Sequence, residues 1–246
     1  GGIIEGNLGA ANVNVNLDGA LYFDGVNDVV TISDNSALEP SSDISLSCWF
    51  KLADTTHDHG RLIAKDGEIL MQVFNQSDSV NIIEIGSWDD WDNRASYNWG
   101  AGDTSWHHLV GAWDDTDDKW RVYFDGVLVA TTSGTSAKPT WGSSNWEIGK
   151  STQFHKGYIA DCRLFNTAIE LADAKILASK INIDNSLISA SSNLVAWWKL
   201  NEGTGTTATD YENSGTDYDG TISGATWKFD AFSVNVQDNS TTTDGT

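Results

Sequence analysis

Apolar and polar residues alternate along much of the chain, and this period of two residues constrains the fold more than any other feature. In residues 44–52, which read ISLSCWFKL, the polar residues Ser45, Ser47 and Lys51 stand between apolar ones. Successive side chains of a β-strand point to opposite faces of a sheet, so the pattern predicts a half-buried antiparallel strand. The same alternation returns over residues 120–130, where Asp125-Gly126 is typical of a two-residue hairpin turn.

Further short strands are expected over residues 12–17, 29–32, 69–74, 81–85, 108–113, 146–148, 158–165 and 230–236. The acidic residues favour turns between them, because 27 of the 35 are Asp and only 8 are Glu, and Asp is unfavourable inside helices. Many short strands separated by turns are typical of a β-sandwich. We therefore predict an all-β fold with two antiparallel sheets and one short helix.

One segment has the pattern of a helix. Thr167 and Glu170 are spaced like the two members of a capping box, and apolar residues follow at helical spacing as far as Ile181. The polar, Ser-rich residues 182–193 are expected to form a linker, and residues 238–246 a flexible tail. The sequence thus predicts a single substantial helix over residues 167–181.

The formal net charge of −21 limits the partners of this chain. Its 14 Lys and Arg against 35 acidic residues exclude nucleic-acid binding by neutralisation of phosphates. The sequence has no run of 18 apolar residues, so no membrane insertion is expected. The two cysteines, Cys48 and Cys162, leave two interpretations: small core residues, or a single cross-strand bridge.

Five segments, taken in order, resemble the signature strands of a known family. They are ALYFDGVNDVV (residues 20–30), ISLSCWFK (44–51), SWHHLVGAW (105–113), VYFDGVLV (122–129) and GYIADCRLFN (157–166). Together they are similar to laminin-G-like domains of the concanavalin A-like lectin/glucanase superfamily. The resemblance implies a jelly-roll sandwich over residues 20–181, preceded by an N-terminal strand or arm at residues 1–19.

One strand departs from the family pattern in its position along the chain. In many relatives a strand like LVAWWKLNEGTG (residues 194–205), continued like DGTISGATW (219–227), precedes the first signature strand, whereas in this chain it follows the helix. Residues 194–237 therefore have three interpretations: they complete the same sandwich, contact a neighbouring copy, or begin a second domain. The first is favoured, because Trp197, Leu200 and Ile222 need a core in which to bury.

Catalytic motifs are sparse. The resemblance points to an E-x-D-x-x-E pattern, with which glycan-cleaving members of the superfamily place two or three carboxylates on one face of a strand. The best match, NIIEIG at residues 81–86, contains Glu84 alone. One carboxylate does not support the usual retaining hydrolysis, and the sequence also lacks a serine elbow, a phosphate loop and a zinc helix. We therefore predict that the protein is not an enzyme.

A calcium ion is the expected cofactor, bound at the turn after the first signature strand. Asp24, Asn27 and Asp28 supply three oxygen-bearing side chains on a tight turn, and Ca²⁺ prefers such ligands. The resemblance adds Asp161, because relatives often hold a structural Ca²⁺ between this turn and the Asp of a G-x-I-x-D strand. The alternative interpretation is that Asp24-Gly25 is only a turn.

The stretch from Trp88 to Trp106 has the composition of a glycan-binding cleft. Sugars stack an apolar ring face on an aromatic side chain, while their hydroxyls bond to Asp, Asn and Arg. The predicted glycan-binding residues are Trp88, Asp90, Trp91, Asp92, Asn93, Arg94, Tyr97 and Trp99. The alternative is that Trp88, Trp99 and Trp106 pack beneath the loop as a satellite core.

These patterns together favour a protein that binds rather than reacts. The first hypothesis is a non-catalytic, calcium-stabilised glycan-binding or adhesion module that contacts a carbohydrate or surface glycan in the extracellular space, on a cell surface or on a virion surface. The second is a structural or decoration protein of a virus or phage particle. In that case self-association is expected, with residues 12–17 and 232–236 contacting neighbouring subunits.

Overall fold

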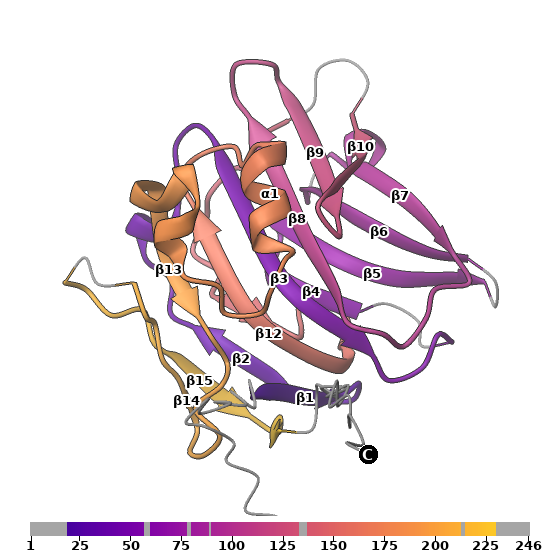
Figure 1. The fold of residues 1–246 in the computed structure, drawn as a ribbon, viewed down its shortest axis with the longest axis vertical. Helices are drawn as coiled ribbons and strands as arrows, with labels where there is room; N and C mark the ends of the chain where they lie inside the picture. The colour runs from indigo at the N-terminus through magenta and orange to yellow at the C-terminus, as the bar shows by residue number, and fades with distance from the viewer. Residues whose placement is uncertain are drawn as a thin grey trace, which may run out of the picture.

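The computed structural model describes residues 19–56, 60–77, 80–88, 90–132, 137–212 and 215–229. These residues fold into two antiparallel sheets packed face to face, with an α-helix against the outside of one sheet (Figure 1). The predicted all-β sandwich is confirmed. The strands expected at residues 12–17 and 230–236, and the tail at 238–246, lie outside the described residues.

Sheet A has the strand order β10-β9-β8-β3-β12-β1-β16, and β13 also pairs with β12. Its strands are β1 (Ala20–Asp24), β3 (Ile44–Leu52), β8 (His107–Asp114), β9 (Lys119–Phe124), β10 (Val127–Thr131), β12 (Lys156–Phe165), β13 (Leu194–Trp198) and β16 (Thr226–Lys228).

Sheet B has the order β14-β15-β2-β11-β4-β5-β6-β7. Its strands are β2 (Val29–Ile32), β4 (Gly60–Lys65), β5 (Ile69–Ser77), β6 (Val80–Ser87), β7 (Ala95–Gly100), β11 (Trp146–Ile148), β14 (Thr207–Ala208) and β15 (Gly220–Ser223). Four short 3₁₀ turns connect the strands: η1 (Ser36–Leu38), η2 (Trp91–Asn93), η3 (Asn185–Leu187) and η4 (Ser189–Asn193).

The main core lies between the two sheets and contains several of the tryptophans. Trp113, Trp120, Trp146 and Trp198 are almost fully buried there. Burial of such large apolar rings is a strong driving force for folding. Part of the high Trp content is therefore explained by packing alone.

Strand β3 shows the predicted alternation, and its two faces are buried to different extents. Its apolar side chains enter the main core, while on the other face the hydroxyl of Ser45 donates to the carbonyl of Thr167 at 2.7 Å and accepts from the amide of Ile169 at 2.9 Å. Further along that face Trp49 and Lys51 are partly exposed. The prediction of a half-buried strand is therefore correct for the second half of β3, whereas the first half is buried on both faces.

The helix α1 (Leu171–Leu177) is shorter than predicted. The expected capping box at Thr167 is wrong, because Ser45 binds the backbone of residues 167 and 169, which lie outside the helix. Glu170 takes the N-cap position instead, without a side-chain cap. The helix packs against the outer face of β8 and β9, where Val110 and Tyr123 are buried (Figure 1).

Residues 182–193 are not a free linker. They form η3 and η4, and Ile188 and Ala190 pack into the small core beneath α1. The carboxylate of Asp173 accepts hydrogen bonds from the amides of Ser189 and Ala190, both at 2.9 Å. These contacts fix the segment to the helix that precedes it.

The C-terminal strands complete the same sandwich, which was the favoured interpretation of residues 194–237 as far as they are described. β13 pairs with β12, β15 pairs with β2, and β16 pairs with β1. In Figure 1 these strands lie beside β1 and β2, which come from the first part of the described chain. Both sheets are therefore closed by residues that come late in the sequence.

The prediction for the two cysteines is resolved. Cys48 and Cys162 are buried and free, so they are core residues and not a bridge. In the described part of the chain, none of the helices has the length and apolar character needed to span a membrane.

Candidate functional site

A row of polar side chains crosses the outer face of sheet B, on the side turned away from the main core. Arg61 of β4 stands opposite Gln72 of β5, Gln72 opposite Glu84 of β6, and Glu84 opposite Ser96 of β7. Arg61, Gln72 and Glu84 are only 4%, 1% and 6% exposed. Polar groups buried this deeply need hydrogen-bond partners, so each of their atoms has to be accounted for.

Glu84 is held firmly at the centre of this row. One of its oxygens accepts from the amide nitrogen of Gln72 at 2.5 Å, and the other accepts from the hydroxyl of Ser96 at 3.0 Å. The guanidinium of Arg94 lies 3.5 Å from the first oxygen. The Glu84 carboxylate is therefore ionically paired and oriented by three neighbours.

Arg94 folds back over β6 and shapes the turn that follows it. A Cβ atom at Gly86 would lie 2.5 Å from the Cγ of Arg94, so this position needs a glycine. The Arg94 side chain donates to the carbonyl oxygens of Ser87 at 3.1 Å and Trp88 at 2.8 Å. Burial lowers the pKa of Arg94, although the nearby Glu84 carboxylate opposes the shift.

Arg61 has a different environment. Its guanidinium carbon lies 5.3 Å from the centre of the Trp88 ring, while its Nε and Nη1 groups have no hydrogen-bond acceptor. Burial, followed by repulsion from Arg94, lowers the pKa of Arg61 to about 10. The side-chain oxygen of Gln72 also lacks a donor. The row therefore contains buried donors and one buried acceptor that have no hydrogen-bond partner, and Arg61 carries these donors beside the Trp88 ring.

The structure divides the predicted glycan-binding residues into separate groups. Trp88 and Arg94 belong to the polar face of sheet B, and Asp92 is exposed in η2. Asp90 is engaged within the protein, because its carboxylate accepts from the side chain of Asn93 and from the amide of Ala137, both at 2.8 Å. For Trp91 the structure describes only the backbone, which lies in η2.

Tyr97 and Trp99 point to the opposite face of β7 and pack against the main core. The ring of Trp99 contacts Phe124 and His107 at centroid distances of 5.2 and 4.7 Å. The packing alternative is therefore supported for Trp99, although this ring packs against the main core and not in a satellite core. Strand alternation explains the split, because Ser96 faces outward and its neighbours in sequence face inward.

Three residues of the polar row were missed by sequence reasoning, namely Arg61, Gln72 and Ser96. For Arg61 and Gln72 the available signal was a polar residue beside or within a run of apolar ones, in GRLIAK and ILMQVF. A buried charge or amide in such a strand is uncommon and indicates a specific role or partner.

The four predicted calcium ligands do not come together. Asp24 accepts hydrogen bonds from the amides of Val26 and Asn27, and Asp28 accepts from the amide of Asp24, so these carboxylates close their own turn. Asp24 pairs with Lys156 of β12, and Asp161 stands five residues further along that strand, roughly 16 Å away.

Asp161 is a buried structural residue. Its carboxylate binds the guanidinium of Arg163 at 2.7 Å, the indole nitrogen of Trp197 at 2.7 Å and the amide of Asn182 at 2.6 Å. Its inclusion in a calcium site is therefore corrected, because a guanidinium occupies the place of the cation. Among the described residues, no group of three or more His, Cys, Asp or Glu is arranged to hold a metal ion.

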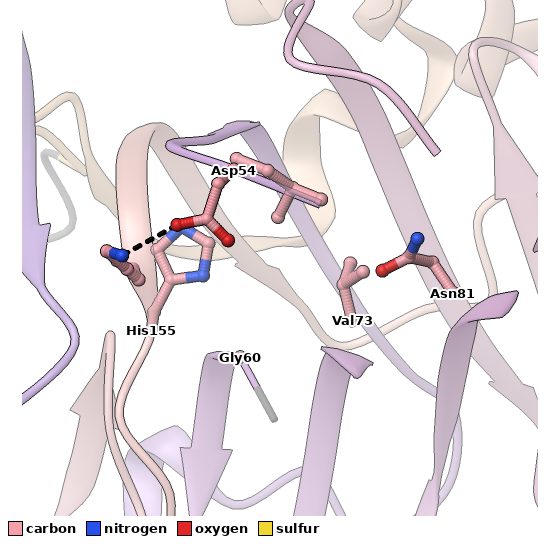
Figure 2. Close-up of a pocket in the computed structure, with 7 residues that line it drawn as sticks. Asp54, Gly60, Val73, Asn81 and His155 are labelled. Atoms are coloured by element: carbon pink, nitrogen blue, oxygen red, sulfur yellow. Dashed lines mark hydrogen bonds and ion pairs between the residues drawn. The ribbon is translucent and has the colours of Figure 1, made fainter. Parts of the chain in front are cut away.

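A small pocket and a wider groove lie outside the polar row. A small pocket between Asp54, Gly60, Val73, Asn81 and His155 has a volume of about 10 Å³, which fits no more than a water molecule. Figure 2 shows its lining, with Asp54 paired to the ammonium of Lys156 at 2.6 Å. This pocket is too small for a sugar.

A wider groove of about 590 Å³ lies on the outer face of sheet A. Tyr22 and Tyr158 form an edge-to-face pair with ring centres 5.0 Å apart, and Lys51 and Lys228 lie over these rings. None of the side chains lining this groove has a buried polar atom without a partner. The outer face of sheet B is the stronger candidate for this reason.

The chain matches the model of the family Laminin_G_3, described as the concanavalin A-like lectin/glucanases superfamily, over residues 24–175. No curated protein sequence matches the chain. A solved structure from Bacteroides ovatus ATCC 8483, described as a candidate carbohydrate binding protein, is similar with a TM-score of 0.66 and 16% identity. That match covers 86% of this chain and 59% of the other, so this chain spans little more than half of that protein.

The native heptameric SAP-like pentraxin from Limulus polyphemus is also similar, with a TM-score of 0.53 and 13% identity over 66% of this chain and 82% of that one. At such identities the likeness concerns the fold. The family model, in contrast, matches more than half of the chain. The protein therefore belongs to the Laminin_G_3 family of the concanavalin A-like lectin/glucanases superfamily.

Proposed function

We propose that the protein is a non-catalytic carbohydrate-binding module, and that the outer face of sheet B is its binding site. The observation that carries this proposal is the polar row beside Trp88, in which Arg61 and Gln72 have buried polar atoms without a hydrogen-bond partner. Two further findings support it: the lectin-like fold of the family, and the description of the similar Bacteroides ovatus protein as a candidate carbohydrate binder.

The chemistry of the row suits a sugar. A pyranose ring presents an apolar face that stacks on an aromatic ring, and hydroxyls that need both donors and acceptors. Trp88 supplies the ring, Arg61 supplies donors, and the side-chain oxygen of Gln72 supplies an acceptor. The row extends over four adjacent strands of sheet B.

The arrangement of Glu84 supports binding without hydrolysis. Glycoside hydrolysis ordinarily needs two carboxyl groups on either side of the scissile bond. In the row Arg61, Gln72, Glu84 and Ser96, a single carboxylate is present, and its two oxygens are bonded to Gln72 and Ser96. A general acid needs a free proton-transferring oxygen beside the substrate, and this geometry does not offer one.

A glycan array followed by isothermal titration tests the proposal. Replacement Trp88→Ala is expected to remove the stacking surface and to abolish detectable binding, because one aromatic platform contributes much of the affinity for a sugar. The matched control is Trp106→Ala, which removes a half-buried tryptophan on the side of sheet A. Equal affinities of both variants and the parent protein would contradict the assignment of the site.

We propose that the module acts outside the cell in adhesion to a surface glycan. We also propose that it binds calcium at the turn formed by Asp24, Asn27 and Asp28. A rise in melting temperature at millimolar Ca²⁺ that disappears in Asp28→Asn would support this, because a ligand that binds the native state stabilises it.

A further inference from the structure

Arg61 differs from the other buried cations of the described chain. Lys65 is fully buried and bonds to carboxylates of three residues, Asp34 at 3.0 Å, Glu39 at 2.9 Å and Glu68 at 2.6 Å. The guanidinium of Arg163 bonds to Asp161, and that of Arg94 lies near Glu84. Arg61 forms no ion pair with any residue that the structure describes, although it is 4% exposed.

A buried cation without a counter-ion is unexpected in this protein. The chain has a net charge of −21, so carboxylates are abundant and most buried cations have taken one. Burying a charge without a partner is unfavourable, and an unsatisfied buried donor adds to the cost. Such an arrangement persists in proteins where it prepares a binding site.

We infer that Arg61 binds the carboxylate group of an acidic sugar. This inference rests on the proposed function and specifies its ligand class. A guanidinium is matched in geometry and charge to a carboxylate, and charge-assisted hydrogen bonds are the strongest that it forms. The unspent Nε and Nη1 groups lie on different edges of the guanidinium, so an anion finds a free donor on either edge.

The charges around Arg61 are mixed. Arg94 repels Arg61, whereas the carboxylates of Glu84 and Asp66 attract it. The oxygens of Glu84 are bonded to Gln72 and Ser96, and they accept no hydrogen bond from Arg61. The free oxygen of Gln72 accepts a hydrogen bond from a neighbouring sugar hydroxyl.

Trp88 controls access to Arg61. Its indole ring covers the guanidinium at 5.3 Å, while its carbonyl oxygen is fixed by the hydrogen bond from Arg94 at 2.8 Å. The backbone of the turn is thus held in place, and rotation of the half-buried indole is what uncovers the donors of Arg61. The same ring then stacks against the face of the sugar that enters.

Isothermal titration with matched pairs of oligosaccharides tests the inference. Each pair consists of a uronic-acid-containing oligosaccharide and its carboxyl-reduced neutral form, and a third arm carries a sulfate ester in place of the carboxylate. Ionic strength is kept constant with NaCl. The unmodified protein is expected to bind the acidic member at least about tenfold more tightly than the neutral one. If the sulfated oligosaccharide bound more tightly than the carboxylated one, the anionic group that Arg61 recognises would be a sulfate ester and not a carboxylate.

The variant Arg61→Met keeps the length of the side chain and removes its charge. It is expected to lose the preference for acidic sugars, and also to melt at a higher temperature than the parent protein, because an unpaired buried charge is removed. A merely structural arginine would instead lower the melting temperature when replaced. The control is Arg121→Met, since Arg121 is paired with Asp114 and Asp117 on sheet A and should leave the sugar preference unchanged.

The outcomes separate the two proposals. Binding of neutral and acidic members with equal affinity, or retention of the acidic preference in Arg61→Met, would overturn the inference and leave the carbohydrate function standing. Binding of neither member of any pair would count against both.

Discussion

Asp161 and Arg163 form a buried ion pair between two positions of the same strand, with 2.7 Å between the carboxylate oxygen and Nε. Asp161 has a positive φ of 52°, and the pairing between β12 and β3 shifts register between residues 160 and 163. The bulge turns both side chains toward Trp197, whose ring lies 4.1 Å from the guanidinium carbon of Arg163. One local irregularity in β12 therefore anchors the C-terminal strand β13.

Replacement Asp161→Asn should destabilise the protein strongly. It leaves the buried guanidinium of Arg163 without a counter-charge, and breaking one side of a buried pair typically costs about 3–5 kcal/mol. Urea unfolding monitored by tryptophan fluorescence measures the loss. The double variant Asp161→Asn with Arg163→Met should recover part of it, and a single variant as stable as the parent would refute the role of the pair.

Replacement Lys65→Met should destabilise sheet B, because Asp34, Glu39 and Glu68 would then face one another without a cation. The expected loss of unfolding free energy at neutral pH is about 3–5 kcal/mol. The loss should shrink as the pH falls, since protonation removes the repulsion between the carboxylates. Urea unfolding at neutral and acidic pH checks this. An identical loss at both would rule out electrostatic repulsion as the cause.

His107 should make the protein less stable at alkaline pH. Burial disfavours its charged form, but hydrogen bonds to Asp125 at 2.7 Å and Asp103 at 3.0 Å outweigh this effect and raise the pKa of His107 above 6.5. A raised folded-state pKa gives stability that is fully present below pH 6.5 and is lost as the pH rises through the folded value. Unfolding free energies of the parent and of His107→Gln should therefore converge at high pH.

His108 should act in the opposite direction. Burial lowers its pKa to about 4, and its Nε2 lies 2.9 Å from the hydroxyl of Ser47. Below pH 6.5 His108 is protonated in the unfolded chain but stays neutral in the folded protein. About 3 kcal/mol of stability is therefore lost as the pH falls toward 4. In His108→Asn the slope of unfolding free energy with pH should flatten in this window. An unchanged slope would assign the acid sensitivity to other groups.

Deletion of residues 190–246 should prevent folding into a monomer. The deletion removes β13, β15 and β16, which uncovers edges of β12, β2 and β1 and takes Trp198 out of the main core. Exposed sheet edges pair with other chains, so aggregation is the expected result. Native mass spectrometry and circular dichroism distinguish this from a folded, soluble monomer, whose appearance would show that the C-terminal strands are dispensable.

The fold could be predicted because its signals are local. The alternation of residues 44–52 identified β3, and the Asp125-Gly126 turn identified the hairpin of β9 and β10, where φ is positive at both turn positions. The helix start and the segment at 182–193 were wrong because distant partners decide them. Ser45, for example, binds backbone groups more than 120 positions away.

The candidate site was less accessible to sequence reasoning. Glu84 and Trp88 could be singled out from the sequence. Arg61 and Gln72 could not, because only the register of β4, β5 and β6 places them beside Glu84. Without that register, no pattern shows that these residues stand side by side. The same holds for Asp161, whose partner Arg163 lies only two positions away but faces it through a bulge.

The late position of β13, β15 and β16 also sets the order of events during synthesis. A nascent chain emerges from its N-terminus, and domains fold as units once their parts are available. The strands before residue 190 leave the ribosome first, yet β1, β2 and β12 must wait for residues 194–228 to fill their edges. The synthesis of residues 194–228 therefore decides when the edges of β1, β2 and β12 are covered, and any pause before it prolongs a state with open strand edges.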